Sequence, residues 1–325
     1  MRTCFIALAA VFCMSLVCAA VAPAKEGSDN VKAFVSILPQ KYFLERVGGD
    51  RVRVSVLVGP GSSPHTYEPT PRQMTELAQA EIFFRIGVPF ENVVIPKIQA
   101  LHKGLTIVDT SEGIELRKAD EDHNHEAHEP KTHKHDSGNT RTEHKHKHGS
   151  EAENDHHHEA GELDPHIWLD PILVKRQAET MCNALTKIDP AHEKTYRENL
   201  KKFESDIDEV NSLVAKALSG VKGKEIFVFH PAYGYFADRY SLKQRAVETG
   251  GKEPGARQLA ALIDRAKKAG IKVIFVQPQF DRKNATTIAR AIGGAVVPLD
   301  PLAPDYLENL RDMARKVESA LSAQQ

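Results

Sequence analysis

Short apolar segments alternate with helical patterns in two separate blocks of this 325-residue chain. Both blocks repeat the order strand, helix, strand, which is typical of parallel strands joined by helical crossovers. The sequence therefore predicts an α/β fold with two lobes, each a parallel sheet covered by helices. The expected strands cover residues 33–37, 52–58, 82–86 and 106–109 in the first block, and residues 225–229, 245–247, 273–276 and 295–299 in the second.

A long helical pattern lies between the two blocks. Apolar residues recur at spacings of three and four after Asp189 and Pro190, a pair that is typical of a helix start. We expect one helix over residues 189–219, roughly 45 Å long at ~1.5 Å per residue. Because one lobe does not require such a length, this helix is predicted to join an N-terminal lobe of residues 25–188 to a C-terminal lobe of residues 220–325.

The start of the chain resembles a secretory signal. A basic residue precedes the apolar region 5–20, and residues 22–24 form a small-residue cleavage site. We expect residues 1–24 to be a signal peptide and the mature protein to be periplasmic. Lipid attachment at Cys18 is an alternative, although residues 15–17 match poorly the pattern that precedes a lipidated cysteine. No later stretch approaches the ~20 apolar residues that span a bilayer, so the mature chain is expected to carry no membrane span.

The overall composition excludes some classes of function. The net charge is −1 and the aromatic content is 6%, so nothing indicates a nucleic-acid surface. After cleavage Cys182 is the only remaining cysteine, which excludes an intramolecular disulfide and a metal site built from sulfur.

Residues 117–161 differ sharply from the rest of the chain, because they are polar and rich in histidine. Such a segment cannot bury enough apolar surface to offset its ordering entropy, so we expect a mobile loop within the N-terminal lobe. Clustered imidazoles bind zinc, copper or nickel weakly and adaptably. The alternative is a solvated, pH-sensitive linker without a role in metal binding. The candidate weak ligands are His123, His125, His128, His133, His135, His144, His146, His148, His156, His157 and His158.

Three other histidines, His65, His166 and His230, each lie beside a proline. A single imidazole is more often an ordinary buried polar group than a ligand. His65 and His230, however, follow predicted strands at their carboxyl ends, where open α/β sheets bind their ligands. Asp300 follows the last strand in the same way. We therefore expect one metal site in a cleft between the lobes.

Several motifs resemble a known family, and they occur in the right order across the whole mature chain. The chain is similar to the periplasmic zinc-binding receptors of bacterial zinc ABC importers, the ZnuA-like branch of the cluster A metal receptors. The motifs are residues 64–71, residues 164–171, His230 with residues 233–236, residues 277–280 and residues 299–302.

This resemblance implies a monomeric receptor that captures Zn²⁺ and delivers it to a membrane permease, and it implies no enzymatic activity. It assigns His65, His166 and His230 as zinc ligands, with Asp300 or water as the fourth. The chain departs from the family pattern at Pro64 and Gln277, where some relatives carry glutamate.

Other interpretations remain possible from the sequence. Three neutral imidazoles and one oxygen match zinc, which prefers a tetrahedron, better than manganese, which favours more oxygen ligands and a higher coordination number. Copper, however, would bind the same nitrogens. Three histidines and a water also occur in zinc hydrolases; against this, the chain contains no His-Glu-x-x-His helix and no evident general base. A metal-buffering or surface adhesion protein would explain the histidine-rich segment but not two lobes.

Overall fold

The computed structural model describes residues 30–119, 163–248, 256–280 and 282–323. The predicted signal peptide and residues 120–161 of the histidine-rich segment, including its eleven candidate ligands, therefore lie outside the described residues. Within the described part of the chain, no helix combines the length and apolarity needed to cross a membrane.

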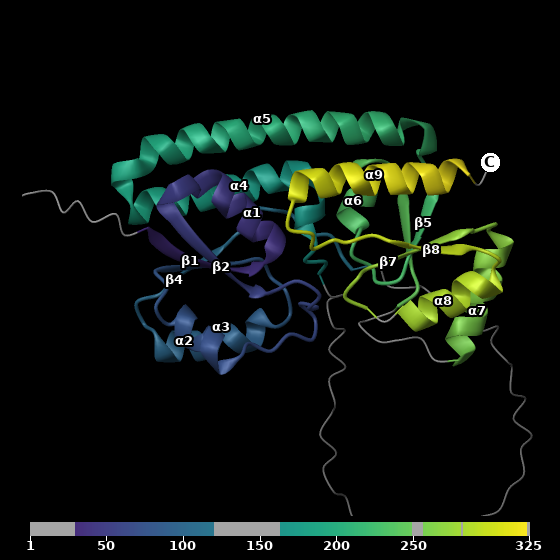
Figure 1. Cartoon of the computed structure of the whole chain (residues 1–325), viewed down its shortest axis with the longest axis horizontal. Helices are drawn as coiled ribbons and strands as arrows, with labels where there is room; N and C mark the ends of the chain where they lie inside the picture. The colour runs from purple at the N-terminus through teal and green to yellow at the C-terminus, as the bar shows by residue number, and fades with distance from the viewer. Residues whose placement is uncertain (1–29, 120–162, 249–255, 281, 324–325) are drawn as a thin grey trace, which may run out of the picture.

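Two four-stranded parallel sheets form the framework, which confirms the α/β prediction (Figure 1). Their strand orders, β2-β1-β3-β4 and β6-β5-β7-β8, are equivalent, so each lobe is built by the same winding of the chain. The first sheet contains β1 (Val31–Ile37), β2 (Val52–Val58), β3 (Ile82–Arg85) and β4 (Thr106–Asp109). The second contains β5 (Glu225–Val228), β6 (Lys243–Ala246), β7 (Val273–Val276) and β8 (Ala295–Pro298).

Helices cover these sheets, and the longest one runs along both lobes. In Figure 1, α5 lies across the top of the molecule, with α4 and α9 beneath it, while α2 with α3 and α7 with α8 lie below the two sheets. The helices are α1 (Leu38–Gly48), α2 (Pro71–Leu77), α3 (Glu91–Leu101), α4 (Pro171–Ile188), α5 (Glu193–Ala217), α6 (Gly234–Arg239), α7 (Ala256–Lys268), α8 (Arg282–Ala291) and α9 (Tyr306–Ser322).

The long helical segment predicted over residues 189–219 is present over Pro190–Val221, although only Glu193–Ala217 is α-helix. A 3₁₀ turn over Pro190–His192 precedes α5, and another over Leu218–Val221 follows it. Asp189 does not cap the helix, because its carboxylate accepts a hydrogen bond from Tyr196 Oη at 2.6 Å and pairs with His192 Nδ1 at 2.7 Å. The buried face of α5 packs on α1, α4 and α9, so the helix contacts elements of both lobes.

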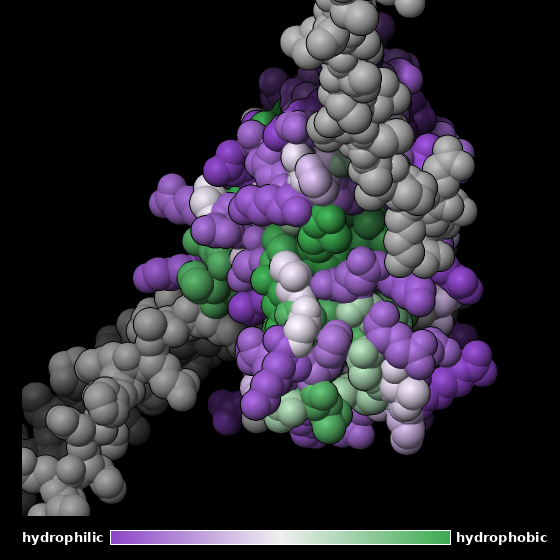
Figure 2. Space-filling model, turned by 90° about the vertical axis from the view of Figure 1, so that its left-hand side faces the viewer, coloured by the Kyte–Doolittle hydropathy of each residue, from purple (hydrophilic) through white to green (hydrophobic). Residues whose placement is uncertain are grey.

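The outer surface of the first lobe is mainly hydrophilic. Seen from that end of the molecule, polar side chains form most of the surface and hydrophobic ones show near the middle of the face (Figure 2). Burial is concentrated instead between the sheets and the α1, α4, α5 and α9 layer, where Trp168, Tyr196 and Phe203 are fully enclosed.

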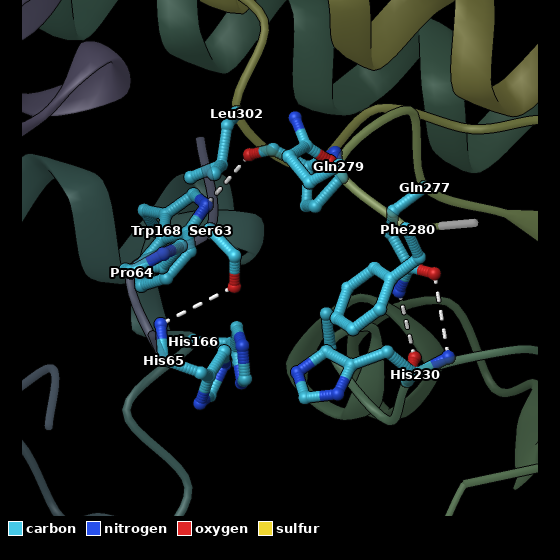
Figure 3. A pocket seen from close by; sticks show the side chains of 12 residues that line it. Ser63, Pro64, His65, His166, Trp168, His230, Gln277, Gln279, Phe280 and Leu302 are labelled. Carbon is cyan, nitrogen blue, oxygen red and sulfur yellow. Dashed lines mark hydrogen bonds between the residues drawn. The ribbon is translucent and has the colours of Figure 1, made fainter. Parts of the chain in front are cut away.

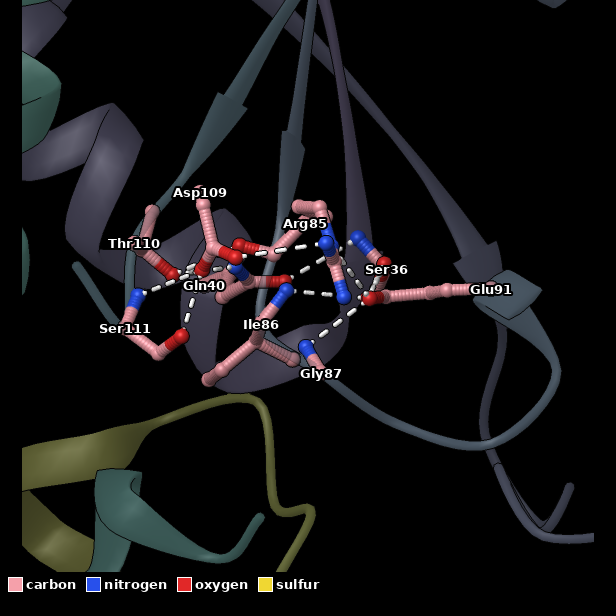
Figure 4. A network of polar contacts seen from close by, with 9 residues as sticks. All are labelled: Ser36, Gln40, Arg85, Ile86, Gly87, Glu91, Asp109, Thr110 and Ser111. Carbon is pink, nitrogen blue, oxygen red and sulfur yellow. Dashed lines mark hydrogen bonds and ion pairs between the residues drawn. The ribbon is translucent and has the colours of Figure 1, made fainter. Parts of the chain in front are cut away.

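A buried polar network ties the carboxyl ends of β1, β3 and β4 together (Figure 4). Glu91 is fully buried and accepts hydrogen bonds from Ser36 Oγ at 2.5 Å, from the backbone amides of Ile86 and Gly87 at 2.9 and 2.8 Å, and from Arg85 at 3.2 Å. Burial raises the pKa of Glu91, although these donors act in the opposite direction. The network fixes the edge of the sheet at which the ligand-bearing loop of this lobe begins.

Candidate metal centre

His65, His166 and His230 converge in the folded chain. Each offers one ring nitrogen, and these nitrogens all lie within 4.8 Å of one another. His65 lies in the loop after β2, His166 directly precedes a 3₁₀ turn over Ile167–Leu169, and His230 follows β5. Figure 3 shows the first two rings side by side, facing the third across a small cavity. The structure thus brings together residues that are up to 165 positions apart, the distance from His65 to His230.

The imidazole of His166 is held by a neighbouring carboxylate. Asp164 Oδ1 accepts hydrogen bonds from the backbone amide of His166 at 2.9 Å and from its ring Nδ1 at 2.7 Å. Burial acts to raise the pKa of Asp164, but the interactions with His166 and Arg117 outweigh it and hold that pKa below its usual value. An ionised carboxylate can only accept, so Nδ1 is the donor and Nε2 is left for a metal.

The ring of His230 is held in the same way, by a carboxylate that follows a different strand. Glu248, which follows β6 and is only 5% exposed, contacts His230 Nδ1 through Oε2 at 3.0 Å. The side chain of Gln277 fixes the backbone, because its Oε1 accepts from His230 N at 3.3 Å and its Nε2 donates to His230 O at 2.8 Å. An ionised glutamate at position 277 could make only the first of these contacts, which gives the glutamine found here a structural role.

His65 has a different environment. Its backbone amide donates a hydrogen bond to Ser63 Oγ at 3.3 Å, and its ring Nε2 is buried without a hydrogen-bond partner among the described residues. The Nε2 of His230 is also buried and lacks such a partner. Buried polar atoms without a partner are rare in folded proteins, so these two nitrogens are suited to a ligand.

The walls around the three rings are largely apolar. Trp168 lies beside His166, and Phe280 stacks on His230 with ring centroids 5.1 Å apart. Pro64 and Leu302 also line the cavity. Its volume is about 10 Å³, which admits one ion or one water molecule.

Burial favours the neutral form of the His65 and His230 imidazoles. Loss of solvent, followed by the neighbouring charges of His230 and His166, lowers the pKa of His65 to about 2. Burial also lowers the pKa of His230, although Glu248 acts against it. Because a histidine must be deprotonated to bind a metal, both rings are in the binding form at neutral pH.

This set of donors fits zinc. Zinc binds imidazole nitrogens at about 2.0–2.1 Å and prefers four ligands in a tetrahedron, which places the nitrogens roughly 3.3 Å apart. The observed separations of at most 4.8 Å exceed that value by no more than ~1.5 Å, so small movements of the rings complete the geometry.

Asp300 is not part of the cluster that the described residues form. Its Oδ1 accepts hydrogen bonds from Gln279 Nε2 at 2.8 Å and from the backbone amide of Leu302 at 2.9 Å. Asp300 therefore has partners outside the cluster, and its role as the fourth ligand stays a prediction.

Sequence reasoning missed Glu248 and the function of Asp164. The signal for Glu248 was available, because this residue follows the strand of residues 245–247 at the same sheet edge as His230. Asp164 lies two residues before His166, a spacing that allows it to reach both the amide and the ring.

Comparisons with known proteins agree with this geometry. Residues 34–320 match the family model described as ZnuA, zinc-uptake complex component A, periplasmic. The high-affinity zinc uptake system protein ZnuA of Bacillus subtilis (strain 168) is 27% identical over 89% of this chain and 86% of the relative. The protein of the same name from Brucella suis biovar 1 (strain 1330) is 30% identical over 89% of this chain and 91% of the relative.

Solved structures show the same relationship. A crystal structure of ZnuA superposes with a TM-score of 0.75 at 36% identity, covering 90% of this chain and 99% of the other. A zinc-bound ZnuA deletion mutant gives a TM-score of 0.76 at 36% identity, covering 91% and 100%. This family consists of metal-binding transport receptors rather than enzymes, which removes the hydrolase interpretation. With a matching family model over nearly the whole described chain and three histidines converging on a zinc-sized cavity, the protein belongs to the ZnuA family of periplasmic zinc-uptake components.

Proposed function

We propose that this protein captures Zn²⁺ with high affinity between its lobes and delivers it to the membrane permease of a zinc ABC importer. His65, His166 and His230 are the proposed ligands, with Asp300 or a water molecule as the fourth. The observation that carries the proposal is the convergence of three ring nitrogens within 4.8 Å. Two of the rings are oriented by buried carboxylates, as is usual for histidines that bind metals.

The proposed site works by preparing its ligands before zinc arrives. The neutral imidazoles of His65 and His230 need lose no proton on binding, and the largely apolar walls leave room for only one ion or water molecule. Zinc bridges His166 and His65 to His230 of the second lobe, so it restricts the relative positions of the two lobes. A permease can thereby distinguish the zinc-loaded protein from the zinc-free protein. Release then requires distortion of the site by the permease.

The cellular setting is part of the same proposal. Residues 1–24 act as a signal peptide, the mature monomer works in the periplasm, and the lobes are residues 25–188 and 220–325 joined by the helix predicted over residues 189–219. The histidine-rich residues 117–161 bind further ions weakly and raise the zinc concentration near the cleft.

Calorimetric zinc titration tests the assignment of ligands. The His230→Ala substitution removes a nitrogen ligand together with the bridge between the lobes, so the affinity of the tight site should fall far more than in Asp300→Ala, where water can replace one oxygen. Equal losses in the two variants would make Asp300 a true ligand. Wild-type protein that contains no zinc after purification from cells, without an affinity resin or added metal, and shows no tight site would contradict the proposed function.

A further inference from the structure

Arg117 occupies a junction between the metal centre and the second lobe. Its Nη1 contacts Asp164 Oδ2 at 3.1 Å, and its Nε contacts Asp238 Oδ2 of α6 at 3.2 Å. The guanidinium carbon lies 5.8 Å from the ring centre of Tyr235, also on α6. The arginine side chain is 22% exposed. One side chain therefore contacts both the segment that carries His166 and a helix of the opposite lobe.

The backbone around Arg117 strengthens this junction. Arg117 O accepts from Asp164 N at 2.9 Å, and Lys118 forms an antiparallel bridge with Leu163. The hydroxyl of Tyr235 accepts from Arg117 N at 2.9 Å and donates to Asp164 O at 3.0 Å. Residues 117 and 118 fall at the start of the range that composition assigned to the histidine-rich loop, yet they make defined contacts that close the base of this segment.

Asp164 connects Arg117 to the proposed ligand His166. Its side chain is 3% exposed. Oδ1 accepts a hydrogen bond from the ring of His166, and Oδ2 accepts one from Arg117. A buried carboxylate needs compensating donors on both oxygens to stay ionised and fixed. Without the guanidinium, Oδ2 loses its charged partner, and only the contacts of Oδ1 with the amide and the ring of His166 hold the carboxylate in place.

We propose that Arg117 is a positioning residue for zinc binding, which fixes the ring of His166 through Asp164 and relates its orientation to α6 of the second lobe. This inference rests on the proposed zinc ligands. Arg117 lies where the histidine-rich segment begins. The proposal therefore gives this end of the segment a role in the geometry of the zinc site formed by His65, His166 and His230. That role is separate from weak zinc binding by the histidines of the segment.

Gly234 supplies an independent way to test the contact. A Cβ atom added at this first residue of α6 would lie 1.3 Å from Arg117 Nη1 and 2.4 Å from its Cζ. The Gly234→Ala substitution must therefore displace the guanidinium, and its Cβ would also lie 3.0 Å from Asp164 Oδ2, so it disturbs the Arg117–Asp164 contact from both sides while it removes no proposed ligand and no charge. Alanine is also the better helix former, so the helix itself should not be weakened.

The experiment measures zinc affinity of the full-length protein by competition with a strong chelator, which leaves only the tight site occupied, and thermal unfolding of the zinc-free protein. Arg117→Met and Gly234→Ala should each weaken zinc about tenfold, the lower end of the range for groups that support metal ligands. Arg117→Lys keeps a cation beside Asp164 but cannot also hold Asp238 and stack on Tyr235, so its zinc affinity should lie between those of wild type and Arg117→Met.

Arg46→Met is the matched control. Arg46 is also partly buried, pairs with a carboxylate, Asp206, and lies over the aromatic ring of Phe203 at 4.9 Å, but it contacts none of the metal-centre residues described above. This variant should unfold at a lower temperature and bind zinc within about twofold of wild type, since its arginine supports packing alone.

Unchanged zinc affinity in Arg117→Met would overturn the proposal. An equal loss of zinc affinity in Arg117→Met and Arg46→Met would also overturn it, because zinc affinity would then follow the stability of the fold. If Arg117→Met does not fold, Gly234→Ala decides, and unchanged affinity in that variant overturns the proposal. The His166→Ala variant separates this inference from the proposed function: if it binds zinc like wild type, the ligand assignment fails, whereas a large loss there beside unchanged Arg117 and Gly234 variants refutes the role of Arg117 alone.

Discussion

His65 and His166 offer the same chemical group to the same cavity, but their surroundings differ. His166 is 5% exposed, and its ring is held by Asp164. Its segment is also fastened to the second lobe, because Trp168 Nε1 donates to Pro301 O at 2.8 Å and Asp170 forms a two-point ion pair with Arg239. Among the described residues, no carboxylate supports the ring of His65 in this way, and its Nε2 has no hydrogen-bond partner.

The residue His65 borders two cavities. It lines the small cavity of the metal centre, and it also lines a larger cavity of about 410 Å³ together with residues that include Tyr67 and Phe90. Gly61 within the loop that carries His65 has a φ of 77°, a conformation that favours glycine. His166 and His230 are therefore each held by a carboxylate, whereas His65 is the proposed ligand most able to move toward or away from the other two.

The largest expected effect separates the two kinds of ligand. We expect His166→Ala to weaken zinc by more than about 100-fold, beyond the range for residues that only support ligands. His65→Ala should lose less, because a ligand whose position is not fixed must first offset the entropy of ordering its loop. Chelator competition measures both affinities, and equal losses would show that the His65 loop is as well ordered as the His166 segment.

A second prediction concerns the supporting groups. Asp164→Asn and Glu248→Gln should each weaken zinc about 10- to 100-fold, because each weakens the acceptor that orients an imidazole. Ser63→Ala removes only a hydrogen bond to the backbone of His65 and should change affinity by less than about threefold. The same titration measures all three, and a loss in Ser63→Ala as large as in Asp164→Asn would mean that the two histidines are supported equally.

The third prediction uses the lowered pKa of His65 and His230. As pH falls below the ordinary value of 6.5, the unfolded chain takes up more protons at these positions than the folded protein, since burial lowers the pKa of His65 to about 2 and also lowers that of His230. The unfolding free energy of the zinc-free protein should therefore fall as pH decreases from 6.5, by at most about 1.4 kcal/mol per pH unit for each residue.

Urea unfolding of the zinc-free protein between pH 7 and pH 5 measures this slope. The His65→Gln variant, which carries no titrating group at that position, should show a shallower slope than wild type over the same range. Identical slopes would mean that His65 is accessible to protons in the folded protein.

The smallest effect is expected from the histidine-rich segment. Deleting residues 120–160 should leave the tight zinc ion in place and remove the weakly bound ions, because both ends of the segment, at Arg117 and Asp164, remain in the chain. Calorimetry counts both classes of site, and circular dichroism checks the fold. Loss of the tight site from a folded deletion variant would place part of the segment in the primary site.

Local sequence patterns were sufficient to predict the architecture and the three histidines that meet. Alternating strand and helix patterns reflect local burial, which is encoded in residues close together in the chain, and the positions after β2 and β5 placed His65 and His230 at the ligand-binding edge. The equivalent strand orders of the two sheets follow from the same repeated units.

The polar groups that support the ligands, in contrast, became visible only in the folded chain. Glu248 reaches His230 from a different strand connection, Arg117 reaches Asp164 across 47 positions, and Asp300 is directed to Gln279. A local pattern can place a residue such as Glu248 at the sheet edge, but it does not encode which pairs form, because the pairs depend on how the two sheets and their loops pack against each other. The partners of Asp189 were also decided by tertiary contacts, since its carboxylate bonds to Tyr196 rather than capping the helical segment that follows it.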